Sequence, residues 1–199
     1  MNNTITICFA VFYYSLTFFA IRHVRFSTRD LCLSGIVVAM TLVLESIRIP
    51  LPTGATTSLL SPVPLMLFAV VSDYRVAIVT GWVCGFLAMV MIPGWQPVHW
   101  GQFLVEHMVC FSCLGYTEIW GTDKRYKIAG GMILASGLKI AGHLFSGVVF
   151  FSQNAWDGWG AWGYSLAYNL SQNLPLCILS GIIIMLLPLK ALKQAADRR

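Results

Sequence analysis

Three ionisable residues lie inside long apolar stretches of the chain, where a charge is costly to bury. They are Glu106, Lys139 and His143. Because a bilayer interior offers no water to solvate such groups, an ionisable side chain there is by default a sign of function. At the helical rise per residue, Glu106 lies roughly 9 Å from the outer end of its predicted helix. His143 reaches a similar depth in the next predicted helix, so both are expected to face one pocket that opens to the outside.

Polar and aromatic side chains from other segments converge on the same depth. One face of the last predicted helix carries Ser165, Asn169, Gln172 and Asn173, since these residues follow helical spacing. The outer loops carry Trp95, Trp100, Trp156, Trp159 and Trp162, with Tyr164 at the start of the last helix. Aromatic faces beside a buried carboxylate suit a flat, cationic organic ligand.

Two plainer interpretations remain open for these residues. The tryptophans also fit an interfacial aromatic belt. Glu106 and Lys139 also fit an ion pair that only holds helices together. Lys139, His143, Gly147 and Phe151 share one helix face, where Gly147 also suits close contact with a neighbouring helix. The agreement in depth between Glu106, His143 and Asn169 favours the pocket.

Apolar runs must position these residues in a membrane. Hydrophobic residues make up 57% of the 199 residues and charged residues only 11%, with a mean hydropathy of +0.73. Soluble domains carry about 25% charged residues. The runs are Thr4–Ile21, Leu31–Ile47, Pro62–Val71, Val76–Ile92, Trp100–Trp120, Ile128–Phe151 and Tyr164–Leu189. At about 20 residues per span they occupy the chain without leaving room for a soluble domain.

The predicted fold is therefore an all-α integral membrane protein with one membrane domain over residues 1–199. A six-helix core covers residues 29–190, and residues 1–25 supply an extra N-terminal transmembrane helix. The stretch Leu51–Ser61 is expected to be a loop, since it follows Pro50 and is rich in Pro, Gly, Thr and Ser.

The distribution of basic residues predicts the orientation. The loops expected on one side carry nearly all of the 13 Lys and Arg residues, whereas the other side carries only Arg48. By the positive-inside rule, the C-terminus is cytoplasmic and the protein is a multi-pass protein of the cell membrane. The net charge of +5 follows this topology and does not indicate nucleic-acid binding.

Motifs of catalysis are missing from the sequence. It contains no G-x-x-x-x-G-K-[ST], no H-E-x-x-H and no G-x-S-x-G. Cys110 and Cys113 form a C-x-x-C, but no second ligand pair accompanies it, so these cysteines are expected to pack rather than bind metal. We therefore predict no catalytic residue, no metal site and no cofactor. A small membrane protein that has a pocket but no ATPase motif of its own is expected to be the binding subunit of a larger complex.

Several motifs occur in a characteristic order. They are Pro52-x-Gly54 with Ser58, Gly81-x-x-x-Gly85, Gln102-x-x-x-Glu106 followed by Phe111 and Gly115, His143-x-x-Ser146-Gly147-x-x-Phe150-Phe151, and Tyr164-Ser165-Leu166-x-Tyr168-Asn169-x-Ser171. From about Leu31 to Leu189 the chain thereby resembles the thiamine-specific substrate-binding (S) components of energy-coupling-factor (ECF) vitamin transporters.

The resemblance implies thiamine, captured from outside, as the transported ligand. It implies ligand contacts at Glu106, His143, Tyr164 and Asn169, with Phe151 at a ring-stacking position and His107 where relatives often have Tyr. The predicted binding set also includes Gly147, Trp100 and Lys139. Glu106 either accepts hydrogen bonds from the amino group of thiamine or balances its cation, and the sequence leaves both roles open.

Partners follow from the same resemblance. It implies a transmembrane coupling protein and two cytoplasmic ATPase subunits that power uptake. Gly35 and Ala39 match a small-residue motif that docks on the coupling protein. The alternatives are an S component for another vitamin or a thiamine precursor and, from a different class, a membrane enzyme with Glu106 and His143 as acid and base. An enzyme would need a nucleophile or a metal near that pair, and the sequence offers neither.

Overall fold

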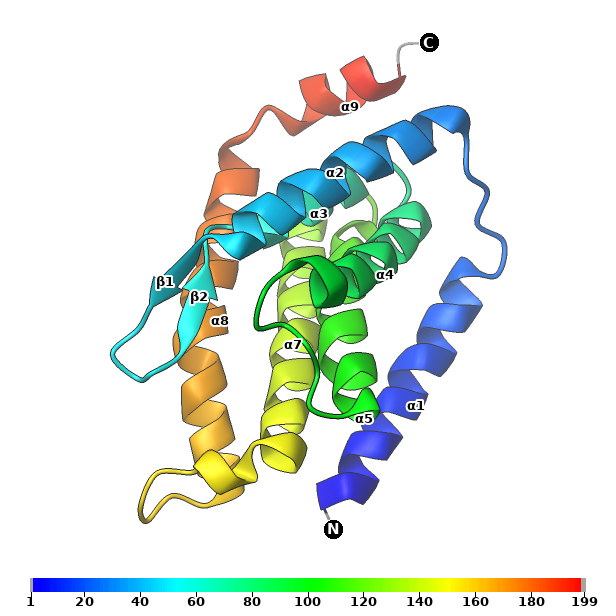
Figure 1. Cartoon of the computed structure of the whole chain (residues 1–199). Coiled ribbons are helices and arrows are strands. Elements are labelled where there is room, and N and C mark those ends of the chain that lie inside the picture. The colour runs from blue at the N-terminus through cyan, green and yellow to red at the C-terminus, as the bar shows by residue number, and fades with distance from the viewer. Residues whose placement is uncertain (1, 198–199) are drawn as a thin grey trace.

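The chain folds into a mostly helical bundle, described from a computed structural model that covers residues 2–197 (Figure 1). In chain order its elements are α1 (Asn2–Ile21), α2 (Thr28–Ser46), β1 (Arg48–Pro50), β2 (Thr56–Ser58), α3 (Pro62–Val71), α4 (Tyr74–Met91), α5 (Trp100–Gln102), η1 (Phe103–Met108), α6 (Val109–Ser112), η2 (Cys113–Glu118), α7 (Arg125–Phe150), η3 (Ser152–Asn154), α8 (Ala161–Leu186) and α9 (Leu189–Asp197). The predicted apolar runs thus correspond to helical segments.

Four helices within residues 2–197 are long and apolar enough to cross a membrane, namely α1, α4, α7 and α8. Helix α3 has ten residues and spans about 15 Å, half of a typical hydrocarbon core. Helix α2 carries Arg29, Asp30 and Glu45, which make its two ends polar. The prediction of a mostly helical, multi-pass membrane protein is confirmed, whereas six spans in the core stay a prediction.

The prediction of an all-helical chain is wrong after α2, where β1 and β2 form an antiparallel hairpin. Arg48 pairs with Ser58, and Pro50 pairs with Thr56. Pro50 and Pro52 prevent α2 from continuing, and Gly54 closes the turn with φ +82, a conformation that favours glycine. Most of the predicted loop Leu51–Ser61 is therefore the tip and second strand of this hairpin. Strands of three residues are too short to show an alternating pattern.

The predicted helix Trp100–Trp120 is helical from Trp100 to Glu118 but changes its register. The π-helical turn η1 interrupts the α-helix, and the 3₁₀ turn η2 ends it. Helix α4 packs closely against this segment, because a Cβ atom on Gly85 would lie 2.5 Å from the carbonyl oxygen of His107. Gly81 contacts the same segment at Ser112. The Gly81–Gly85 pair therefore packs within the chain.

The two ends of the chain differ in how they join the bundle. The last predicted helix ends at Leu186, because Pro188 disfavours helical geometry at Leu187, which is extended with ψ 152. The short helix α9 follows and is held by a 2.7 Å hydrogen bond from Lys193 Nζ to Thr122 Oγ1. At the other end, α1 lies along the flank of the bundle opposite α8 (Figure 1) and contacts α4, α7 and η1.

Candidate functional site

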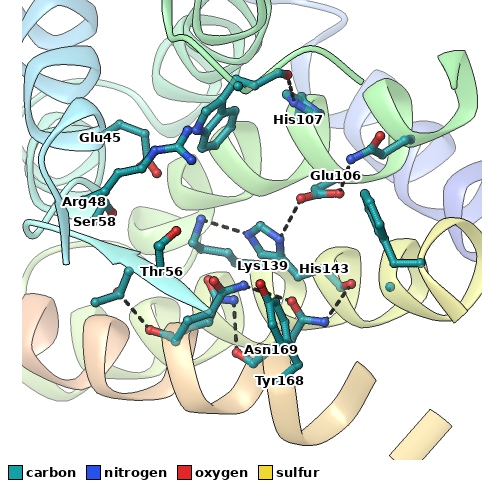
Figure 2. A pocket seen from close by; sticks show the side chains of 18 of the residues that line it. Glu45, Arg48, Thr56, Ser58, Glu106, His107, Lys139, His143, Tyr168 and Asn169 are labelled. Carbon is teal, nitrogen blue, oxygen red and sulfur yellow. Dashed lines mark hydrogen bonds and ion pairs between the residues drawn. The ribbon is translucent and has the colours of Figure 1, made fainter. Parts of the chain in front are cut away.

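A cavity of about 380 Å³ lies between the hairpin, η1, α7 and α8 (Figure 2). Its size is within the range of pockets that bind small organic molecules. The residues that line it are Glu45, Arg48, Thr56, Thr57, Ser58, Gly94, Trp95, Gln96, Val98, Gln102, Glu106, His107, Lys139, His143, Gly147, Phe151, Asn154, Tyr164, Tyr168, Asn169, Gln172, Asn173 and Leu176. Most of these side chains are polar or aromatic, so the cavity suits a ligand with both flat rings and hydrogen-bonding groups.

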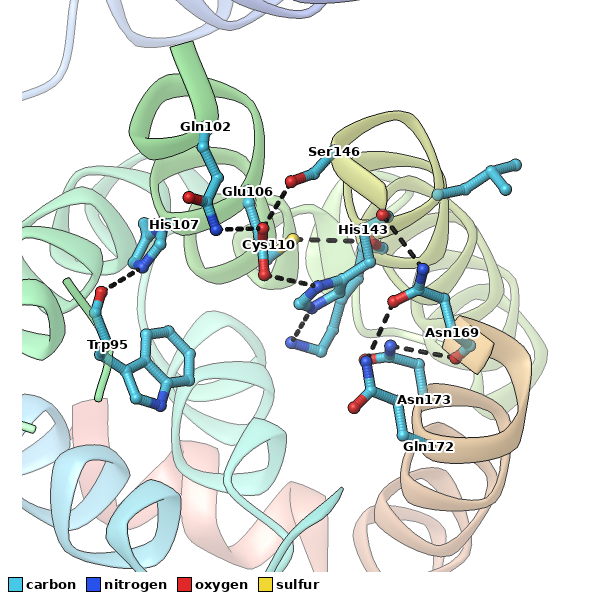
Figure 3. A network of polar contacts seen from close by, with 12 residues as sticks. Trp95, Gln102, Glu106, His107, Cys110, His143, Ser146, Asn169, Gln172 and Asn173 are labelled. Carbon is cyan, nitrogen blue, oxygen red and sulfur yellow. Dashed lines mark hydrogen bonds and ion pairs between the residues drawn. The ribbon is translucent and has the colours of Figure 1, made fainter. Parts of the chain in front are cut away.

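The carboxylate of Glu106 is held by donors from two segments (Figure 3). Its Oε2 atom accepts hydrogen bonds from Ser146 Oγ at 2.5 Å and from Gln102 Nε2 at 3.0 Å. Its Oε1 atom lies 3.3 Å from His143 Nδ1. Ser146 and His143 belong to α7, whereas Gln102 lies one turn before Glu106 on its own segment. The carboxylate therefore has a fixed orientation at one end of the cavity.

His143 connects Glu106 to Lys139. The Nε2 atom of His143 lies 3.4 Å from Lys139 Nζ. A neutral imidazole with its proton on Nδ1 donates to Glu106 and accepts from Lys139 at Nε2, which satisfies both contacts. Lys139 is 4% exposed, and its ammonium lies 5.6 Å from the centre of the Phe111 ring. The alternative of a direct Glu106–Lys139 ion pair is therefore wrong, because the imidazole lies between the two charges.

The polar stripe of α8 both joins α7 and faces the cavity. Ser165 Oγ donates to the carbonyl of Leu144 at 2.8 Å, and Asn169 Nδ2 donates to the carbonyl of His143 at 3.2 Å. This contact is possible because Gly147 has no side chain: a Cβ atom there would lie 2.2 Å from Ser165 Oγ. Asn169, Gln172 and Asn173 line the cavity, whereas Ser165 ties the two helices together.

The hairpin end of the cavity carries two further charged side chains. Glu45 and Arg48 lie there, on the side away from Glu106 (Figure 2). The Arg48 guanidinium lies 5.7 Å from the centre of the Trp95 ring. His107 Nε2 donates to the carbonyl of Trp95 at 2.8 Å, which leaves the buried Nδ1 atom as an acceptor without a hydrogen-bond partner. This end of the cavity therefore combines aromatic surface with one acidic and one basic side chain.

The structure brings most of the predicted binding residues together. The cavity is lined by Glu106, His107, Lys139, His143, Gly147, Phe151, Tyr164 and Asn169. Trp100 lies outside it, with 73% of its surface exposed and its ring packed against Phe103. Gly35 and Ala39 lie on an exposed face of α2, where a Cβ atom on Gly35 would meet nothing within 4 Å.

Other lining residues were not in the predicted binding set. Glu45 and Arg48 lie at the end of a predicted helix, where charged residues are ordinary. Gln102 precedes Glu106 by one turn, and this spacing is the signal that would have placed it on the same face. Tyr168 lies one residue before Asn169 and packs its ring 5.4 Å from that of Tyr164. The hairpin residues could not be found without knowing that the loop folds back.

A helical membrane protein with a preformed polar and aromatic cavity belongs to the class that binds a small solute. The family model described as Thiamine transporter protein (Thia_YuaJ) matches residues 31–196, and the chain belongs to this family. It is thus a substrate-binding S component of an ECF transporter and not an enzyme.

Two individual proteins illustrate the similarity. The thiamine transporter ThiT of Bacillus subtilis (strain 168) is 25% identical over 168 residues, which are 77% of this chain and 86% of that protein. The solved structure of ThiT from Listeria monocytogenes matches this chain with a TM-score of 0.73 and 23% sequence identity. The match covers 84% of this chain and 96% of the Listeria chain. The second comparison supports the fold.

Proposed function

We propose that the chain captures thiamine from outside the cell in the cavity around Glu106 and passes it inward with the help of separate ATPase subunits. One observation carries the location of the site. A carboxylate held by Ser146, Gln102 and His143 faces a cavity of about 380 Å³ that also presents aromatic rings. Such a fixed acceptor beside flat hydrophobic surface suits an aromatic ligand that carries hydrogen-bond donors.

The chemistry of thiamine fits the two ends of the cavity. Thiamine joins an aminopyrimidine to a positively charged thiazolium ring. In the proposed pose, Glu106 accepts a hydrogen bond from the amino group of the pyrimidine, because its Oε1 atom has only the His143 contact while Oε2 already has two donors. Phe151 and Tyr164 supply aromatic faces for the rings.

The charges that line the cavity favour the hairpin end, away from Glu106, for the thiazolium. The Glu106 carboxylate already accepts from Ser146 and Gln102 and faces His143, so little unpaired negative charge remains at that end for a cation. Glu45 lies at the hairpin end and supplies a negative charge for the thiazolium. Arg48 is next to Glu45, but its guanidinium lies over the Trp95 ring. The proposed pose therefore points the pyrimidine at Glu106 and the cation towards Glu45.

The proposed architecture follows the S components. Residues 29–190 form the six-helix core, with α2, α3 and the segment from Trp100 to Glu118 completing the spans that length alone does not establish. The C-terminus is cytoplasmic. The exposed α2 face with Gly35 and Ala39 docks on a transmembrane coupling protein, which in turn carries two ATPases. The absence of a P-loop from the sequence supports this division of labour.

Gly35→Leu is expected to leave thiamine binding unchanged and to abolish uptake. Gly35 is exposed and its Cβ position is open, so leucine fits the isolated chain, but small residues allow close helix contact with a partner. The measurement compares binding by the purified protein with uptake of labelled thiamine by cells that also make the coupling protein and ATPases.

Gly137→Leu is the matched control, because Gly137 of α7 is also exposed with nothing within 4 Å of its Cβ position. Uptake by the control should equal that of the wild type. Wild-type protein that neither binds nor imports thiamine would refute the proposed function. Normal uptake by Gly35→Leu would instead show that α2 docks elsewhere or not at all.

A further inference from the structure

Helix α1 lies outside the residues that match the family model, yet it bonds to the segment that carries Glu106. Tyr14 Oη donates to the carbonyl oxygen of Leu104 at 2.7 Å. Tyr13 Oη lies 2.6 Å from Ser112 Oγ, and Thr17 Oγ1 lies 2.8 Å from Tyr116 Oη. Three residues of one helix thus make side-chain hydrogen bonds to the neighbouring segment between Leu104 and Tyr116.

Two of these bonds act on the π-helical turn η1. Leu104 lies near its start and Met108 at its end. Ser112 Oγ donates to the carbonyl of Met108 at 2.5 Å, so its single proton is used there and Tyr13 must donate to Ser112. Tyr14 therefore binds one end of the turn directly, and Tyr13 binds the other end through Ser112. Glu106 lies between these two points.

The same helix also packs against the other segment that holds Glu106. The ring of Phe9 lies 4.7 Å from the ring of Phe145 in α7. Phe145 precedes Ser146, whose hydroxyl donates to the Glu106 carboxylate. Helix α1 therefore contacts both sides of the junction at which Glu106 is fixed, although none of the described side chains of α1 lines the cavity.

The two faces of α1 are clearly different. On the inner face, Tyr13 is 1% exposed and Thr17 is 0% exposed. On the outer face, Phe12, Phe18 and Phe19 are all more than 60% exposed, as suits contact with lipid chains. A membrane anchor would need only the apolar outer face. The buried hydroxyl groups of the inner face indicate a specific contact with the bundle.

We propose that α1 is a positioning element of the ligand site, in which Tyr13 and Tyr14 fix the π-helical turn and thereby the carboxylate of Glu106. A π turn is rare in helices and is frequent at functional sites, and its carbonyls gain from donors outside the segment. This inference rests on the proposed function, since it assigns α1 a role in thiamine binding. It explains why a helix outside the family match is bonded to the site.

Tyr14→Phe tests this role, because it removes one hydroxyl and keeps the ring. We expect thiamine to bind about three- to tenfold more weakly, the usual effect of one lost hydrogen bond. Oxythiamine, which has oxygen in place of the amino group, should be affected less, so the preference for thiamine over oxythiamine should fall. Both affinities and the melting temperature are measured on purified protein.

Tyr126→Phe is the matched control, because Tyr126 is 66% exposed at the start of α7, away from the cavity. It should keep the wild-type preference. An unchanged preference in Tyr14→Phe, whether thiamine binding is normal or both ligands weaken equally, would overturn the inference. If Tyr14→Phe does not fold, Tyr13→Phe gives the same test. A wild-type protein that binds no thiamine would instead refute the proposed function, so the two failures are distinguishable.

Discussion

Glu106→Gln is expected to weaken thiamine binding about 100-fold while the protein still folds. Hydrogen bonds to a charged acceptor are worth roughly 1.5–3 kcal/mol, and about 1.4 kcal/mol corresponds to a tenfold change in affinity. The glutamine keeps an oxygen that can accept from Ser146, which now donates at 2.5 Å. The fold is therefore preserved, whereas the negative charge that attracts the amino group is lost.

The measurement is a thiamine titration of the purified variant, with thermal unfolding as the check on folding. Glu118→Gln is the matched control, since Glu118 is a half-buried glutamate at the end of the same segment and does not line the cavity. The control should bind like the wild type. Equal affinities of Glu106→Gln and wild type would remove Glu106 from the ligand site.

Gly147→Val is expected to reduce both stability and thiamine affinity. A Cβ atom at this position would lie 2.2 Å from Ser165 Oγ and 3.0 Å from Asn169 Nδ2. The two helices must then separate, and overpacking of this kind costs about 1–3 kcal/mol. Separation displaces Asn169 and alters the cavity wall, so thiamine binding should fall by more than about tenfold.

Gly137→Val separates this steric effect from the cost of valine in a helix. Gly137 lies in the same helix, ten positions earlier, and its Cβ position is open. Thermal unfolding and thiamine titration of both variants give the comparison. If the two variants melt and bind alike, the close contact between α7 and α8 at Gly147 has no special importance.

The sequence was sufficient to predict the helices and the polar centre of the cavity. Ionisable residues are rare in apolar helices, so Glu106, Lys139 and His143 were conspicuous. The motifs around Tyr164 and Asn169 placed α8 beside them. All five of these residues line the cavity. Helical spacing placed Lys139 and His143 on one face, whereas the ligand contact at Tyr164 was predicted from the family resemblance.

The remaining features depend on contacts that periodicity does not report. The π-helical turn changes which residues of the segment from Phe103 to Met108 face the cavity, and no local pattern marks it. The hairpin that brings Arg48 and Ser58 to the cavity has strands of three residues. Trp100 was predicted from its loop position, but its ring packs on Phe103 outside the cavity.

The contacts of α1 with the bundle also could not be predicted from the sequence. Its apolar composition predicted a helix, and the helix is present from Asn2 to Ile21. The sequence could not show that Tyr14 reaches the Leu104 carbonyl, because the two residues are 90 positions apart. A pairing between distant segments becomes visible only when the helices are placed in space.

The central claim is that thiamine binds in the cavity around Glu106, and a titration of the purified wild-type chain with thiamine tests it most directly. Trp95 lines the cavity and Trp156 packs 5.2 Å from the Tyr164 ring, so intrinsic tryptophan fluorescence reports on the site. We expect saturable quenching with one thiamine per chain and micromolar or tighter affinity. A folded protein whose fluorescence and melting temperature do not respond to millimolar thiamine would contradict the account.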